Sequence, residues 1–285
     1  GKASLSGYIW GQSDVNSTPH EITLPDGQET ILTPLYQQKN ELSTVQTQSF
    51  STEIQQKFDY RKYPFQKEDI EVRIRPINLA SNTLLTPDLK AYHRTNPESY
   101  PGVDKDIHVD GWEVVGSFFS LNPISFGTNF GTYEKAKEDA SNELVFNVSL
   151  KRSYISPLLT NFIPISVVAL LLYSVLLIIS TDRTTTSRFG FSTSTVLGFC
   201  GSLFFAVIVA HLNLRSGLGA QGVIYIESFY FALYGALVVV ALNSLFVVSG
   251  IQVGHFKVGN NDLIKILYWP MMMLILYIVT FLAFT

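Results

Sequence analysis

The sequence predicts an all-β domain at residues 1–153, followed by a transmembrane domain of four helices at residues 154–285. Charge placement is the first observation behind this prediction: the front part holds 15 Lys/Arg and 20 Asp/Glu, and the back part holds only 5 and 3. The second is a mean hydropathy of +0.22, which is high for a soluble chain of 285 residues. The third is a change from short alternating segments to long apolar ones.

Five short segments of the front part have the composition of β-strands. They are rich in β-branched and aromatic residues, and Pro, Asn, Asp and Gly separate them. The segments are residues 6–10, 49–54, 70–74, 112–118 and 144–150. Apart from a short candidate at residues 133–141, no amphipathic helix is predicted there. We expect an extracellular, immunoglobulin-like sandwich of two sheets that is large enough to bury its own core.

Four stretches of the back part are long and apolar enough to cross a membrane, whose hydrocarbon core of about 30 Å takes about 20 helical residues. Backbone groups in lipid must be satisfied internally, so these spans are expected to be helices. Glu227 is the one carboxylate within them, and Pro164 and Pro270 interrupt the first and the last. The expected spans are residues 156–180, 188–210, 221–249 and 263–285.

Basic residues in the connecting loops predict the orientation of the chain. Loops 181–188 and 250–265 carry most of the basic side chains, whereas Arg215 alone lies between the second and third spans. Positive-inside counting therefore places those two loops in the cytoplasm and the β domain outside. We expect a multi-pass protein of the cell membrane.

Composition also argues against several functions. The front part has a net charge of −5 and the back part +2, so neither has the basic surface that nucleic-acid binding needs. The sequence contains no Gly-x-Ser-x-Gly, His-Glu-x-x-His or Walker motif, so we expect no enzyme. Cys200 is the only cysteine, so neither an intrachain disulfide nor a zinc cluster is expected, and no cofactor is predicted.

The second span carries small and hydroxyl residues in a helical stripe. The stripe follows gaps of three and four residues: Ser187, Gly190, Ser194, Leu197, Gly201, Phe204 and Ile208. One end of the stripe is small and polar and the other bulky and apolar. This suits a water-filled pore whose hydrophobic constriction gates by dewetting. Alternatively, the small residues let helices pack closely in lipid.

Four motifs in order resemble the prokaryotic pentameric ligand-gated ion channels of the Cys-loop receptor superfamily, proton-gated members among them. The motifs are Asp-Tyr-Arg-Lys-Tyr-Pro-Phe-Gln at residues 59–66, Asp-Gly-Trp-Glu at residues 110–113, Arg152 followed by Ile163-Pro164, and the pattern of residues 188–197. The similarity covers nearly the whole chain. The sequence departs from the family at one position. Gln66 occupies the place of a family aspartate that pairs with an arginine, and Arg152 corresponds to that arginine. Asp59 or Glu68 are alternative partners for Arg152. The family's first strand would precede Gly1.

The resemblance implies a homopentamer, in which four identical further subunits close a ring in a bacterial inner membrane around a pore for inorganic ions. The β domain would be periplasmic, and Leu197 would form the hydrophobic gate. The agonist is expected to be a small ligand, a proton or a divalent cation. Arg188 would bias ion charge at the inner mouth or anchor the helix there, and the selectivity is left open because no Glu lies beside it. The alternative is a non-conducting membrane receptor or sensory module.

The resemblance also implies a gating interface at Tyr63, Pro64 and Phe65. This tip would press on the loop at residues 212–220, with Arg152 holding the junction between the two domains. An ordinary hydrophobic tip is the other interpretation. Ligands of the family bind between subunits. There we expect an aromatic wall for a cationic ligand, formed by Trp10, Phe130 and Tyr133. The alternative is that these three aromatic residues belong to the core of the β domain.

Acidic residues suggest two further sites. Asp104, Asp106 and Asp110 form a cluster that either holds a divalent cation, such as calcium acting as a modulator, or is a solvated acidic loop. Glu227, at the start of the third span, is a candidate proton or cation sensor because carboxylates in membranes are costly. The alternative is a solvated position at the membrane interface.

Overall fold

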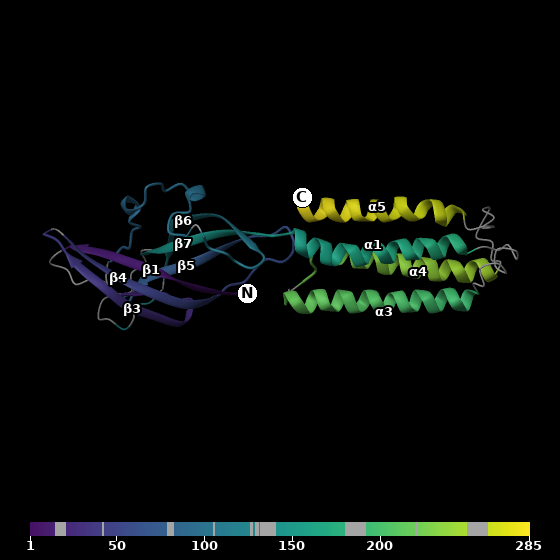
Figure 1. Ribbon diagram of the computed structural model, residues 1–285, viewed down its shortest axis with the longest axis horizontal. Helices are drawn as coiled ribbons and strands as arrows, with labels where there is room; N and C mark the ends of the chain where they lie inside the picture. Colours follow the sequence, from purple (N-terminus) through teal and green to yellow (C-terminus); the bar gives the residue numbers. More distant parts are fainter. Residues whose placement is uncertain are drawn as a thin grey trace. The chain divides into compact units, whose positions relative to one another are not determined.

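The computed structural model describes residues 1–14, 21–41, 43–78, 83–104, 106–125, 128, 131, 141–179, 192–219, 222–249 and 262–285. The chain divides into two compact units (Figure 1). The β unit comprises residues 1–58 and 67–152, and the helical unit comprises residues 59–66 and 153–285. The prediction of β-sheets followed by four long apolar helices is confirmed. Residues 59–66, which the prediction assigned to the β domain, group with the helices instead.

The described residues of the β unit form two antiparallel sheets. The first has the strand order β1-β4-β3, formed by β1 (Lys2–Asp14), β4 (Ser43–Gln55) and β3 (Gly27–Lys39). The second has the order β2-β5-β7-β6, formed by β2 (Ile22–Thr23), β5 (Lys67–Pro76), β7 (Ser141–Arg152) and β6 (Trp112–Ile124). All five predicted strand segments lie within β1, β4, β5, β6 and β7. Two short 3-10 helices, Leu89–Ala91 and Pro97–Ser99, lie between β5 and β6.

Strand β3 was not predicted, because its sequence lacks the usual signal. It contains Pro34 and several amide side chains, and it lies at the edge of its sheet. Proline is tolerated at such edges and at irregular pairings. The pairing of β3 with β4 shifts register between Pro34 and Tyr36, which agrees with this rule.

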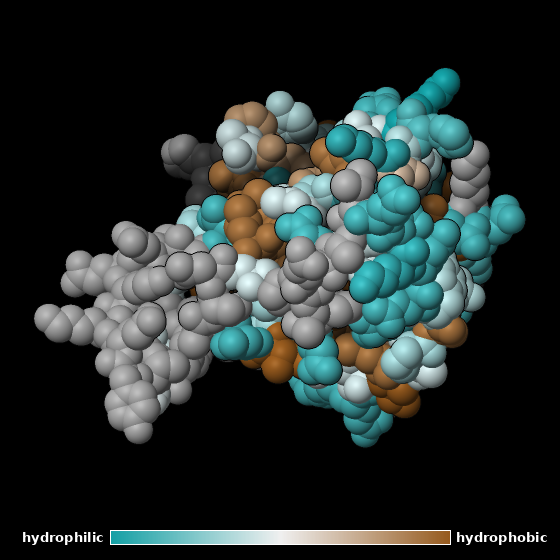
Figure 2. Space-filling view, turned by 90° about the vertical axis from the view of Figure 1, so that its left-hand side faces the viewer, coloured by the Kyte–Doolittle hydropathy of each residue, from teal (hydrophilic) through white to brown (hydrophobic). Residues whose placement is uncertain are grey.

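The interior of the β unit is only partly filled. Buried apolar side chains from both sheets form a small cluster: Leu24, Ile54, Val72, Ile74 and Leu144. Beside it lies a cavity of about 2480 Å³ lined by residues of both sheets. The β unit therefore has an apolar core of its own with a cavity beside it. The face of this unit seen in Figure 2 is covered largely by hydrophilic residues.

Among the described residues of the helical unit, four helices are long and apolar enough to span a membrane, and the protein is a multi-pass membrane protein. They are α1 (Ile155–Ile178), α3 (Thr193–Leu218), α4 (Glu227–Ser249) and α5 (Asp262–Phe284). Each predicted span is confirmed as a helix. The boundaries differ around the second connection, because α3 continues to Leu218 rather than residue 210 and α4 begins at Glu227 rather than residue 221. Gly219 ends α3 in the left-handed conformation, with φ of 56°.

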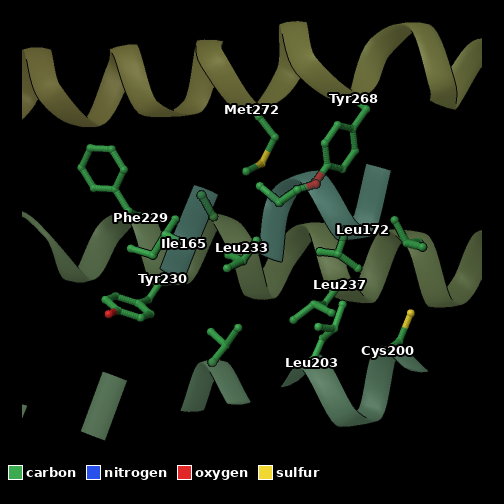
Figure 3. Packing of buried hydrophobic residues seen from close by; sticks show 14 of the residues in the cluster. Ile165, Leu172, Cys200, Leu203, Phe229, Tyr230, Leu233, Leu237, Tyr268 and Met272 are labelled. Atoms are coloured by element: carbon green, nitrogen blue, oxygen red, sulfur yellow. The ribbon is translucent and has the colours of Figure 1, made fainter. Parts of the chain in front are cut away.

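Helix α4 is the most extensively buried of the four helices. Its Leu233 and Leu237 lie at the centre of the apolar cluster, and Figure 3 shows Tyr268 and Met272 of α5 pointing toward the same region. The hydroxyl of Tyr268 donates a hydrogen bond to the carbonyl of Ala169 in α1, at 2.9 Å. Shape matching and this bond stabilise the packing, because lipid is as apolar as the core and provides little hydrophobic driving force.

Candidate functional site

Helix α3 buries one face and leaves the other open within the subunit. Its buried side chains recur at helical spacing: Val196, Cys200, Leu203, Val207 and Leu214. The described members of the predicted pore stripe lie elsewhere on the helix. Ser194, Leu197, Gly201 and Phe204 are exposed and Ile208 is half-buried, whereas Ser187 and Gly190 lie outside the described residues. The pore-lining role of the stripe stays a prediction.

The open face of α3 combines polar and apolar side chains. Leu197 is 37% exposed and Phe204 is 45% exposed. Small and hydroxyl residues are exposed along the same helix: Ser194, Thr195, Gly198, Gly201 and Ser202. At its start, the side chain of Ser192 accepts a hydrogen bond from the Thr195 amide at 3.3 Å, which caps the helix. This face offers a continuous surface for water or another protein chain.

Glu227 lies at the centre of a buried polar network between α3 and α4. Its side chain is 1% exposed, so the alternative of a solvated position is wrong. Its Oε1 accepts a hydrogen bond from Arg215 Nη1 at 2.8 Å and lies 3.3 Å from His211 Nε2. Its Oε2 accepts from the amide of Ile224 at 3.1 Å. Several donors compensate the loss of hydration of this carboxylate.

His211 extends this network to α1. Its ring stacks on Tyr230, with centroids 5.1 Å apart, and its Nδ1 lies 3.2 Å from the hydroxyl of Tyr234. Tyr230 in turn donates to Oδ1 of Asn161 in α1, at 3.3 Å. Sequence reasoning identified Glu227 but missed its partners, because they come from the preceding helix. The available signal was the i, i+4 pair of His211 and Arg215 at the end of a span, since an intramembrane carboxylate requires donors.

The predicted gating segment, residues 59–66, packs against the helices. Tyr63 is buried in the same apolar cluster as the membrane helices, and Pro64, which follows a cis peptide bond, is fully buried. The carbonyl of Arg61 accepts a hydrogen bond from the amide of Tyr225 at 2.9 Å. This segment is therefore hydrogen-bonded to the residues that lead into α4.

Phe65 is the centre of an aromatic cluster in the helical unit. Its ring lies 5.5 Å from Tyr154, 6.2 Å from Tyr225 and 5.9 Å from Phe284. Lys62 places its ammonium 5.8 Å from the Phe284 ring. These contacts connect the start of α1, the segment before α4 and the end of α5.

The predicted contact partner of Tyr63, Pro64 and Phe65 was a loop at residues 212–220, but residues 212–218 are helical. These residues are the last turns of α3, whose polar side chains at positions 211 and 215 are satisfied by α4. Tyr225, after that loop, is one of the residues that contact the gating segment.

The charged and polar residues in or near the gating segment have different surroundings. Arg152 is the last residue of β7, and its guanidinium lies 5.1 Å from the Trp112 ring. Asp59 forms an ion pair with Arg61, whose side chain and amide both donate to the carboxylate and lower the pKa of Asp59 to about 2. Gln66 is buried, and among the described residues its side-chain oxygen and nitrogen have no hydrogen-bond partner.

Trp10, the described member of the predicted ligand site, faces the cavity of its own β unit. Its indole N–H donates to Asp88 at 3.1 Å, and its ring lies 5.9 Å from Tyr92. Burial, together with the charge of Asp88, raises the pKa of the Tyr92 hydroxyl. Phe130 and Tyr133 lie outside the described residues, so an aromatic wall made with them stays a prediction.

The three aspartates of the predicted cation site do not gather around a common point. The amide of Asp106 donates to the Asp104 carboxylate at 3.1 Å, and Asp110 pairs with His108 at 3.5 Å. Within the described part of the chain, no group of three His, Cys, Asp or Glu side chains is arranged to hold a metal ion. These contacts are typical of a solvated acidic loop.

No protein-family model matches the chain, and no curated protein matches it. The features that bear on function are therefore its own: the open face of α3, the polar network around Glu227 and the contacts of residues 59–66.

Proposed function

We propose that this chain is one subunit of a pentameric ligand-gated ion channel whose pore is lined by α3. The observation that carries the proposal is the open face of α3, which exposes Ser194, Thr195 and Ser202 on a membrane-spanning helix. Hydroxyl groups are costly in hydrocarbon and favourable against water. Five copies arranged about an axis would turn these faces toward a common channel.

The proposed gate is a ring of Leu197 side chains, with Phe204 extending it along the helix. Both residues are partly exposed in the chain, although the Phe204 ring also lies 5.5 Å from that of Tyr234, and their exposed surfaces would meet their copies around the axis. A narrow apolar ring excludes ions because they would lose hydration there, and a small widening lets water return. Ser194 provides a more hydrophilic surface one turn away.

The proposed coupling runs through two connections. Residues 59–66 are attached to the helices through Tyr63, Phe65 and the hydrogen bond between Tyr225 and Arg61. In addition, only two residues separate the end of β7 at Arg152 from the start of α1 at Ile155. Movement of either the gating segment or β7 would therefore bias the helices between two arrangements.

The remaining features of the proposal follow the resemblance in the four motifs. The two sheets would form an immunoglobulin-like sandwich in the periplasm, and the pentamer would lie in a bacterial inner membrane. The agonist would be a small ligand, a proton or a divalent cation such as calcium.

The test is a planar-bilayer recording of the purified full chain while pH, calcium and candidate ligands are varied. Leu197→Ser should shift activation to about tenfold lower agonist concentration, because it stabilises the hydrated, open state of the ring. Val209→Ser is the matched control, since Val209 is also an exposed apolar residue of α3 but lies off the stripe. It should leave activation nearly unchanged.

Two results would contradict the channel. One is the absence of current from both proteins under every condition although each assembles as a ring, which would favour a non-conducting receptor. The other is a mass in detergent that corresponds to a monomer or dimer.

A further inference from the structure

The ionisable side chains near the end of α3 continue the proposed pore stripe. His211 and Arg215 follow Ile208 at gaps of three and four residues, which keeps them on the same side of the helix. The sequence of Thr193–Leu218 contains no Asp or Glu. Whatever fixed charge this helix brings to the pore is therefore positive.

Glu227, the ion-pair partner of Arg215, keeps its own negative charge away from the open face. Glu227 is 1% exposed, whereas the side chain of Arg215 is 45% exposed. The Ile224 amide fixes the second oxygen of Glu227 and holds the carboxylate in the interior. The ion pair is thus oriented, with its negative end buried and its positive end accessible.

His211 is a second contact that holds Glu227 in place. A carboxylate oxygen accepts hydrogen bonds, so His211 Nε2 carries the proton that faces Glu227 at 3.3 Å. The other ring nitrogen lies 3.2 Å from the hydroxyl of Tyr234. The His211 side chain is only 14% exposed, whereas that of Arg215 is 45% exposed, so Arg215 is the basic group that the open face presents.

We propose that Arg215 makes the outer end of the pore electropositive and gives the channel a preference for anions. The inference rests on the proposed function, and it names the class of ion that the pore passes. Five guanidinium groups around a mouth with low-dielectric walls raise the local concentration of anions and lower that of cations. Their counter-charges, five buried Glu227 carboxylates, lie farther from the ion path.

The experiment measures reversal potentials in asymmetric KCl and converts them to the ratio of chloride to potassium permeability. The native channel should have a ratio above one. Arg215→Gln combined with Glu227→Gln removes both charges and leaves no unpaired buried carboxylate, and it should lower the ratio roughly threefold or more.

Glu227→Gln alone provides an independent arm that does not require the double variant to fold. It preserves the shape of the side chain and removes only the counter-charge, so the ratio should rise above the native value. Because Arg188 is unchanged in every variant, any difference between them belongs to the pair of Arg215 and Glu227.

The outcomes separate this inference from the proposed function. A chloride-to-potassium permeability ratio below one in the native protein would overturn the role of Arg215, and so would an equal ratio in all variants. Either result would leave the channel function standing. The absence of current from every assembled ring would instead refute the channel itself, and the selectivity with it.

Discussion

Helices α3 and α5 both leave a broad face open in the subunit, but the two faces have different chemistry. On α5 the exposed side chains between Ile266 and Leu282 are apolar or aromatic, and the Thr280 hydroxyl is hydrogen-bonded to the Leu276 carbonyl. On α3 the exposed residues include Ser194, Arg215 and Ser202, whose hydroxyl likewise donates to a backbone carbonyl, that of Gly198. The two helices have the same mean hydropathy and similar lengths. We therefore expect the composition of an open face, more than the hydropathy of its helix, to decide whether the face meets lipid or water.

The largest expected effect is on aqueous accessibility. In a Cys200→Ala background, Ser194→Cys should react with a charged, water-soluble thiol reagent about a hundredfold faster than Leu274→Cys on α5, because the reactive thiolate forms poorly in hydrocarbon. Reaction rates with reagent on each side of the membrane provide the measurement. Equal rates at the two positions would remove the distinction between the faces.

A smaller effect is expected on stability when a leucine on the buried face of α3 and one on the open face of α5 are each replaced by alanine. Leu203→Ala should lower the free energy of unfolding by about 2 kcal/mol, since it opens a cavity among packed helices. Leu282→Ala is the matched control: Leu282 is 72% exposed, and lipid can fill the space that it leaves. Unfolding in mixed micelles would measure both, and a comparable loss in the control would show that α5 packs against another protein chain.

The smallest effect concerns the attachment of α5 at its end. The hydroxyls of Tyr225 and Thr280 lie 2.9 Å apart. Tyr225→Phe and Thr280→Val should each cost about 1 kcal/mol of stability, and the double variant should cost little more than either one, because the same bond is lost. Additive losses in this cycle would mean that the two hydroxyls act separately.

Much of the fold was predictable because its signals are local. Hydropathy over about twenty residues located all four membrane helices, and alternation located five strands. Strand β3 was missed because Pro34 and its amide-rich neighbours give no such pattern, and pairing with β4 stabilises it instead. The cavity in the β unit was equally hidden, since the way two sheets fill their common interior depends on residues distant in sequence.

The candidate site was predictable where one helix face sufficed. The stripe containing Ser194 and Leu197 follows from periodicity alone, and the structure leaves this side of α3 open. The end of α3 was predicted wrongly because polar residues such as His211 and Arg215 are typical of a loop. In the structure their partner is Glu227 of the next helix. The spacing of His211 and Arg215 within α3 was the only local signal of a network that is completed by the next helix.

Cys200 belongs to the buried face of α3 and is the sole thiol of the chain. The chain therefore contains a single natural reporter, located where α3 packs against its neighbouring helices. Alkylation of this thiol requires these helices to separate, so its rate in the unmodified protein would measure their transient separation. Any ligand that speeds or slows this reaction would be detected without an engineered label.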